Sequence, residues 1–219
     1  MPRSSAAAVD LVIPVKSLAA AKSRLLGAAD AGVGDRDAHA ALVLAMAGDT
    51  IRAALEATGV RRVLVVTPDP VVALMAEREG ALSLRDEPGG GLNAAVEHGA
   101  RALRRDDAAS VVGALQADLP ALRPAELSAA VAAAAGRRAF CTDRQGSGTT
   151  LLLSAAGGEL QPRFGPGSAH AHQATGALLM LGRWPSLVSD VDRECDLLLV
   201  GELGLGPRSA ALMAAGAAR

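Results

Sequence analysis

Two lysines stand out in this chain, because every other one of its 22 basic residues is an arginine. Lys16 follows the apolar run 9–15, and Lys22 lies shortly after it, next to Arg24. A lysine carries a compact ammonium group on a flexible stem, which suits it to contact a phosphate oxygen. A buried strand that leads into a cation-bearing turn is a common way to hold the phosphates of a nucleotide. The pattern predicts phosphate binding at these three residues, and the alternative is a chance grouping on a solvated face.

Three aspartates form a second group of candidate residues. Asp118 follows the apolar strand pattern 110–115, and Asp190 and Asp192 are spaced so that they share one face of an extended strand. Ligands of open α/β sheets bind at the carboxyl ends of strands, and carboxylate oxygens suit hard cations such as Mg²⁺. We interpret the three aspartates as a metal site for transfer at phosphorus. The alternatives are a turn cap for Asp118 and a solvated strand end or a helix N-cap for the other two.

Three loops rich in glycine and hydroxyl side chains complete the candidates. Residues 89–93 lead into a helix, and Asn93 carries both a donor and an acceptor for the edge of a base, unless this is only a flexible loop. Residues 143–150 and 163–168 offer amides and hydroxyls that suit a carboxylate or a phosphate. Ser168 equally fits the cap of a short helix that begins at Ala169, and composition does not separate these interpretations.

Strand and helix patterns alternate along the chain, which is typical of a mostly parallel sheet covered on both faces. With 219 residues, half of them hydrophobic, and no internal repeat or long linker, we expect a single domain over residues 1–219. The patterns predict strands at 9–15, 62–67, 80–84, 110–115, 139–142, 149–153 and 186–190, and helices at 35–57, 70–79, 92–103, 124–135, 193–200 and 207–219.

The composition argues against several classes of protein. A net charge of −1 gives no global attraction to nucleic acid or membranes, and two Phe, one Trp and no Tyr leave little surface for base stacking. Cys141 and Cys195 lack metal-ligand spacing, and His170 and His172 are typical of a polar loop. No apolar run approaches the roughly 20 residues that span a bilayer, and residues 1–8 lack a signal-peptide pattern. We expect a cytoplasmic protein.

Taken together, the ordered motifs resemble the CofC/FbiD family, the guanylyltransferases of coenzyme F-420 biosynthesis. The resemblance runs through nearly the whole chain and implies a Rossmann-like three-layer α/β/α nucleotidyltransferase fold, like that of nucleotide-diphospho-sugar transferases, with a mixed, mostly parallel sheet. It also implies GTP and Mg²⁺ as requirements. The matching segments are residues 12–16, 21–25, 92–93, 115–120, 143–149, 162–168 and 190–192.

The resemblance also implies roles for individual residues. Mg²⁺ would be held by Asp118, Asp190 and Asp192, and the GTP phosphates would be contacted by Lys16, Lys22 and Arg24. The rest of the nucleotide would be contacted by Leu92 and Asn93. A phosphorylated three-carbon acid would be bound by Thr149, Gly165 and Ser168.

The implied reaction is the transfer of GMP from GTP to the acid, with release of pyrophosphate. The Ala- and Arg-rich composition is typical of a high-GC bacterium and favours phosphoenolpyruvate as the acceptor, while 2-phospho-L-lactate and 3-phosphoglycerate stay open. Hand-over of the product to the next enzyme of the pathway also stays open.

Two other functions are alternatives. A molybdopterin or sugar-phosphate nucleotidyltransferase would share the fold, but such enzymes usually carry a glycine-rich loop with an arginine directly after the first strand, and residues 16–21 contain no glycine. A GTP-binding scaffold protein would not need the three carboxylates.

Overall fold

A computed structural model describes residues 8–19, 21–30, 32–86 and 89–217. The expectations for residues 1–7, for residues 87–88 before the glycine loop and for residues 218–219 at the end of the last helix lie outside these ranges. Within them, seven strands form one sheet in the order β3-β2-β1-β4-β6-β5-β7. The strands are β1 (Val9–Pro14), β2 (Val60–Thr67), β3 (Leu82–Arg85), β4 (Val111–Leu115), β5 (Ala139–Thr142), β6 (Thr149–Leu153) and β7 (Leu178–Leu179).

The sheet is mixed and mostly parallel, as predicted. Only β6 among these seven strands runs antiparallel to its neighbours, β4 and β5. The central strands are buried on both faces: in β1, Leu11 and Ile13 join one hydrophobic core and Val12 joins the other. Continuous apolar runs are typical of strands with helices on both sides, which is why β1 and β4 were recognisable in the sequence.

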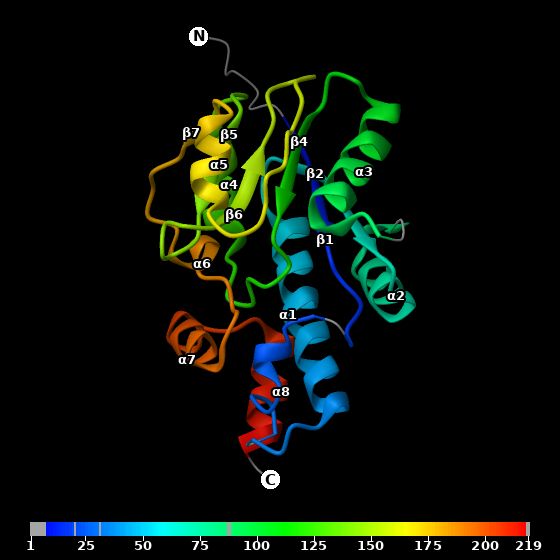
Figure 1. Cartoon of the computed structure of the whole chain (residues 1–219), viewed down its shortest axis with the longest axis vertical. Helices are drawn as coiled ribbons and strands as arrows, with labels where there is room; N and C mark the ends of the chain where they lie inside the picture. The colour runs from blue at the N-terminus through cyan, green and yellow to red at the C-terminus, as the bar shows by residue number, and fades with distance from the viewer. Residues whose placement is uncertain (1–7, 20, 31, 87–88, 218–219) are drawn as a thin grey trace.

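Helices cover both faces of the sheet and give the predicted three layers (Figure 1). One face carries α1 (Arg36–Glu56), α2 (Pro70–Glu79), α4 (Pro124–Ala134) and α6 (Pro185–Val188), and the other carries α3 (Gly91–Asp106) and α5 (Ser168–Ala174). Two further helices follow, α7 (Glu194–Leu203) and α8 (Pro207–Ala217). Helices α7 and α8 meet one end of α1 in a third hydrophobic cluster, together with the short 3-10 helix η1 (Ser23–Leu25).

Helix α1 departs from the expectation about apolar segments. By length and composition alone it is apolar enough to cross a membrane, and it is the one such helix in the described ranges. However, 61% of its most apolar window is buried in the protein. Its residues Ala47, Ile51 and Ala54 pack on the sheet, so α1 is the core helix of a soluble α/β domain.

The predicted strand at 186–190 is wrong. Residues Pro185–Val188 form the helical turn α6 instead. Pro185 has a fixed φ that suits the first helical position, and Leu187 is fully buried in the core under the sheet. The amide and hydroxyl of Ser186 both donate to Glu126 Oε2, at 2.8 and 2.7 Å. A short apolar run has no period that distinguishes a strand from a buried turn of helix. The short strand β7, in turn, was not predicted.

Candidate active site

The candidate site lies where the order of the strands reverses. From β1 the chain continues to β2 and β3 on one side, whereas β4 pairs with the other side of β1. Strands β1 and β4 are parallel, so their carboxyl ends lie at the same edge of the sheet. This is where ligands of open α/β sheets bind. Lys16 follows the end of β1, and Asp118 follows the end of β4.

A buried threonine of α1 fixes the position of Asp118. The Thr50 hydroxyl accepts the amide of Leu119 at 3.1 Å and lies within hydrogen-bond distance of the carbonyls of Met46 (2.9 Å) and Ala117 (3.1 Å). Thr50 is fully buried. Thr50 was not among the residues predicted from the sequence. The feature that could have indicated it is a polar side chain in the middle of an apolar helix.

The segment with Asp190 and Asp192 is tied to Asp118 through its central residue. Val191 is fully buried, and its amide donates to the Asp118 carbonyl at 3.0 Å. The N-cap role that was the alternative for these aspartates belongs to neither, because the N-cap residue of α7 is Arg193. Asp196, inside the first turn of α7, accepts the amides of Asp192 (3.1 Å) and Arg193 (2.9 Å). Asp196 was also missed.

The three predicted carboxylates therefore converge. One ligand oxygen from each of Asp118, Asp190 and Asp192 lies within 4.8 Å of the other two. Burial, together with the charges of the other two, raises the pKa of Asp190 to about 7. Asp118 Oδ1 is buried and has no hydrogen-bond partner. A cluster of hard oxygen ligands with an unpartnered buried oxygen fits a divalent cation such as Mg²⁺.

Lys22 is the cation of this cluster. Its Nζ contacts the carboxylates of both Asp118 and Asp192. Burial alone would lower the pKa of Lys22, but the two carboxylates outweigh burial and raise it. The Lys22 backbone is left-handed, with φ 52°, a conformation that is uncommon for residues other than glycine and is often found at functional sites. The Ala21 carbonyl, which is 2.8 Å from His39 Nε2, anchors this turn to α1.

A cavity of about 410 Å³ connects the cations to the carboxylates. The exposed Lys16 lies on a loop that is held by two amides, from Val15 to the Val66 carbonyl (2.9 Å) and from Leu18 to Asp69 Oδ2 (3.0 Å). A larger cavity of about 910 Å³ lies along α3, and its lining contains no predicted site residue. Six of the predicted residues line the smaller cavity: Lys16, Lys22, Arg24, Leu92, Asp118 and Asp192.

Comparison with known proteins bears on the identity of this site. The MobA-like NTP transferase domain family matches residues 44–177. A protein of Geodermatophilus obscurus named phosphoenolpyruvate guanylyltransferase is 52% identical over 95% of both chains, and one of Salinispora arenicola with the same name is 50% identical over 92% of both. The chain belongs to this family of guanylyltransferases. It is accordingly an enzyme of the nucleotidyltransferase class.

Solved structures confirm the fold. A Desulfovibrio desulfuricans protein described as a nucleotide-diphospho-sugar transferase aligns with a TM-score of 0.70 and 15% identity over 97% of this chain and 96% of its own. A nucleotidyl transferase from Methanothermobacter aligns with a TM-score of 0.59 and 17% identity over 90% and 97%. The predicted nucleotide-diphospho-sugar transferase-like fold is thereby confirmed.

Of the three residues that the family resemblance assigns to the acid, two are in direct contact. The hydroxyls of Thr149 and Ser168 are 3.3 Å apart, and both residues are buried. The alternative role for Ser168, as the cap of a helix that begins at Ala169, is wrong: Ser168 is the first residue of α5, and Gly167 is at the N-cap position. Gly165 has φ 137°, which strongly favours glycine, and it has open space where a side chain would be.

Asn93 has a structural contact that the sequence did not reveal. Its Oδ1 accepts the Phe164 amide at 2.8 Å, and its Nδ2 donates to the Phe164 carbonyl at 3.0 Å. One amide hydrogen and one lone pair remain, so contact with a base stays a prediction. The observed role joins the start of α3 to the loop that contains Gly165.

The amides of the other glycine loop have a partner within the chain. Asp143 accepts the amides of Ser147 (2.8 Å) and Gly148 (2.7 Å) through its two carboxylate oxygens. These amides were predicted from the sequence to suit a carboxylate or phosphate of a ligand. Asp143 also adds to the negative charge that raises the pKa of Asp190, so the loop carries its own anion next to the aspartate cluster.

Proposed function

We propose that this chain transfers GMP from GTP to phosphoenolpyruvate, forming enolpyruvoyl-2-diphospho-5′-guanosine and releasing pyrophosphate. The observation that carries the proposal is the convergence of cations and carboxylates on one cavity at the carboxyl ends of β1 and β4. The proposed acceptor comes from the relatives, which are about 50% identical to this chain and are named phosphoenolpyruvate guanylyltransferase. The sugar-phosphate alternative has a structural neighbour described as a nucleotide-diphospho-sugar transferase, but that protein is only 15% identical to this chain.

In this proposal Lys16, Lys22 and Arg24 bind the GTP phosphates. All three line the cavity, and their positive charges offset the repulsion between two polyanionic substrates. Leu92 and Asn93 are proposed to contact the rest of the nucleotide, at the start of α3.

Asp118, Asp190 and Asp192 are proposed to hold Mg²⁺. When bound, the metal supplies neutralisation of phosphate charge and orientation of the reacting oxygens. The chain's own contribution is the arrangement of the carboxylates, which Thr50, Val191 and Asp196 fix through the hydrogen bonds described above.

The proposed chemistry is an in-line displacement at phosphorus. A phosphate oxygen of phosphoenolpyruvate attacks the α-phosphorus of GTP and forms a new P–O bond. The bond from the α-phosphorus to its bridging β-oxygen breaks, and that oxygen leaves with the electron pair as part of pyrophosphate. The attacking phosphate is already an anion at neutral pH, so no general base is needed. Lys22 and the neighbouring cations offset the repulsion between the two anionic substrates, which makes their approach costly in water.

Thr149, Gly165 and Ser168 are proposed to bind the acid. Two hydroxyls and a glycine backbone with open space beside it suit a small anion that must be held close to the chain. The proposal extends to a place in coenzyme F-420 biosynthesis, in the cytoplasm, with the labile diphosphate product passed to the next enzyme.

The test is pyrophosphate release from GTP with Mg²⁺ and each of three acids: phosphoenolpyruvate, 2-phospho-L-lactate and 3-phosphoglycerate. We expect release with phosphoenolpyruvate and a nucleotide product of the mass of enolpyruvoyl-2-diphospho-5′-guanosine. Preference for another acid would replace the acceptor and keep the guanylyltransferase. Two outcomes would refute the proposal. One is pyrophosphate release from ATP or CTP in place of GTP, and the other is no pyrophosphate release with any of the three acids.

A further inference from the structure

A buried histidine lies behind the two hydroxyls of the proposed acid site. His172 in α5 is fully buried. Its Nδ1 is 2.9 Å from Thr149 Oγ1, and its Nε2 accepts the Arg163 amide at 2.8 Å. The Phe164 ring packs edge-on against the imidazole at 5.1 Å between centroids, and the Phe140 ring lies at 6.0 Å. Both ring nitrogens thus have partners, and the orientation of the ring is fixed.

These partners determine where the proton of the imidazole lies. A backbone amide can only donate, so Nε2 must be the unprotonated acceptor. Burial, together with the charges of Arg138 and Arg163, lowers the pKa of His172 to about 4, so the ring is neutral at neutral pH. A neutral imidazole has one N–H, which is therefore on Nδ1 and donates to Thr149 Oγ1.

The direction of this bond decides what the two hydroxyls offer to a ligand. Thr149 and Ser168 have two hydroxyl protons between them, and their mutual hydrogen bond of 3.3 Å uses one. Because His172 donates to Thr149 and takes no proton from it, the other proton is free. With the opposite tautomer, the Thr149 proton would be directed to Nδ1 and withdrawn from a ligand. The pair therefore presents a hydrogen-bond donor, which is the group that a carboxylate or phosphate needs.

The same imidazole holds the loop that carries Gly165. The Arg163 amide is bound to His172 from α5, and the next amide, of Phe164, is bound to Asn93 from α3. Two consecutive residues are thereby held by side chains from two helices on the same face of the sheet.

We propose that His172 is a positioning residue for the acceptor acid. It directs the free proton of the Thr149–Ser168 pair to the acid and holds the backbone next to Gly165, without contacting the acid itself. This inference rests on the proposed function, since it takes Thr149, Gly165 and Ser168 to be the acid site.

Two substitutions separate the two hydrogen bonds of the ring. In His172→Gln the amide reaches towards the Nε2 position and can accept the Arg163 amide, but the donor to Thr149 is lost. In His172→Asn the shorter side chain retains a donor near the Nδ1 position. Without the donor from His172, the Thr149 hydroxyl loses its fixed orientation towards the acid. The loss of one hydrogen bond to a charged ligand lowers affinity by about 10-fold or more. We therefore expect His172→Gln to raise the KM for phosphoenolpyruvate about 10-fold, with the KM for GTP within about twofold, and His172→Asn to raise it less.

A double-mutant cycle tests whether His172 acts through Thr149. Thr149→Val removes the hydroxyl, and Thr149→Ser retains it as the matched control. In the Thr149→Val background, His172→Gln should add little to the KM for the acid, because coupled residues are not additive. Independent, additive effects would overturn the proposal, as would an equal rise in the KM values for GTP and acid that parallels a fall in melting temperature.

The tautomer is tested separately from activity. The ¹⁵N spectrum of histidine-labelled wild-type protein should show His172 with its proton on Nδ1 and an unprotonated Nε2. A proton on Nε2 would overturn the inference whatever the acceptor proves to be. Absence of wild-type turnover with phosphoenolpyruvate would instead refute the proposed function, so the two failures are distinguishable.

Discussion

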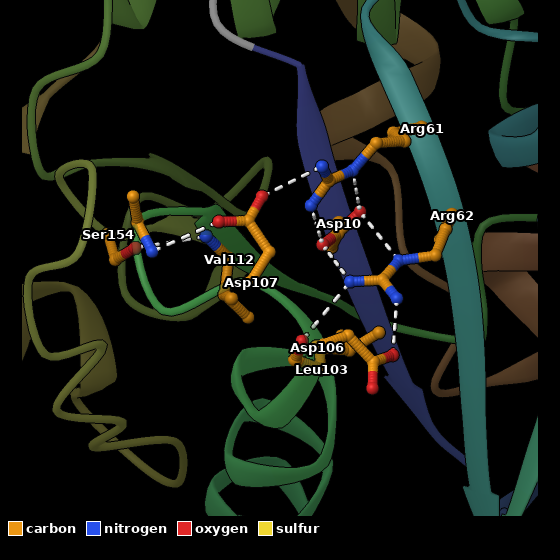
Figure 2. A network of polar contacts seen from close by, with 9 residues as sticks. Asp10, Arg61, Arg62, Leu103, Asp106, Asp107, Val112 and Ser154 are labelled. Atoms are coloured by element: carbon orange, nitrogen blue, oxygen red, sulfur yellow. Dashed lines mark hydrogen bonds and ion pairs between the residues drawn. The ribbon is translucent and has the colours of Figure 1, made fainter.

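The protein has carboxylates near both ends of β1, and their surroundings differ. At the amino end, Asp10 is fully buried between two arginines (Figure 2). Arg61 binds it at 2.9 and 2.6 Å, and Arg62 at 3.2 and 2.7 Å. The arginines also reach Asp107 at 2.8 Å and Asp106 at 2.7 Å. At the carboxyl end, three aspartates converge, and the one lysine beside them contacts two, Asp118 and Asp192.

The difference appears in the pKa values. Burial would raise the pKa of Asp10, but the hydrogen bonds from Arg61 and Arg62 outweigh it, and the pKa falls below 3.8. Burial, together with the charges of Asp118 and Asp192, raises the pKa of Asp190 to about 7. A buried carboxylate with two bidentate cations is complete and serves the fold. Carboxylates with a deficit of positive charge are suited to a cation that the chain does not provide.

The largest expected effect is at the carboxyl end. Asp118→Asn should retain the fold but lower the rate of transfer by about 10³-fold, because it removes a charged ligand from the proposed metal site. Steady-state pyrophosphate release and circular dichroism check the two halves of this expectation. Near-normal turnover in the variant would show that Asp118 is not a ligand of the metal. The carboxylates near both ends of β1 would then have only structural roles.

The matched substitution at the amino end should have the opposite profile. Asp10→Asn leaves each of the two arginines with one carboxylate partner, Asp107 for Arg61 and Asp106 for Arg62. Breaking a buried ion pair typically costs about 3–5 kcal/mol. We expect chemical denaturation to show a loss of this order, with kcat unchanged for the folded fraction. A fall in kcat at unchanged stability would contradict the structural role of Asp10.

Acidification should affect the carboxyl end of the sheet first. His172 has a pKa of about 4 in the folded protein, against an ordinary value of 6.5. Between these values the unfolded chain binds more protons, so this contribution to stability is complete above pH 6.5 and is lost as pH falls towards 4. It amounts to at most about 3 kcal/mol. The contribution of Asp10 should be lost only below pH 3.8.

Urea denaturation at intervals from pH 7 to pH 3 measures both contributions. In His172→Gln the slope between pH 6.5 and pH 4 should be smaller, while the loss below pH 3.8 should persist. An unchanged slope in that variant would assign the acid sensitivity to another group.

The smallest expected effect concerns the support of Asp118. Thr50→Val removes the hydroxyl that accepts the Leu119 amide and should cost about 1–2 kcal/mol in unfolding free energy, because a buried amide loses its partner. Transfer should slow by several-fold, since Asp118 loses part of its fixed position. Thr50→Ser, which keeps the hydroxyl, is the control and should be close to wild type in both measurements.

Much of the fold was predictable because its signals are local. The buried strand β4 and the part of β1 after Asp10 are continuous apolar runs, and α1 has the period of a helix with polar residues at its start. The predicted strand at 186–190 failed because a four-residue helical turn and a short strand have similar composition. The cations and carboxylates were recognisable because lysine is rare in this chain and the aspartates follow apolar segments.

The sequence by itself thus determined the alternating order of strands and helices and the residue types available at the carboxyl ends of β1 and β4. Only the tertiary structure decided which of these residues meet. Lys22 contacts Asp192 across most of the chain, Asn93 binds Phe164 instead of standing free, and His172 is buried behind Thr149 although its sequence is typical of a polar loop. Such contacts join positions far apart in the chain, so no local period encodes them. They form when helices from different segments pack on one sheet and each buried polar atom must find a partner.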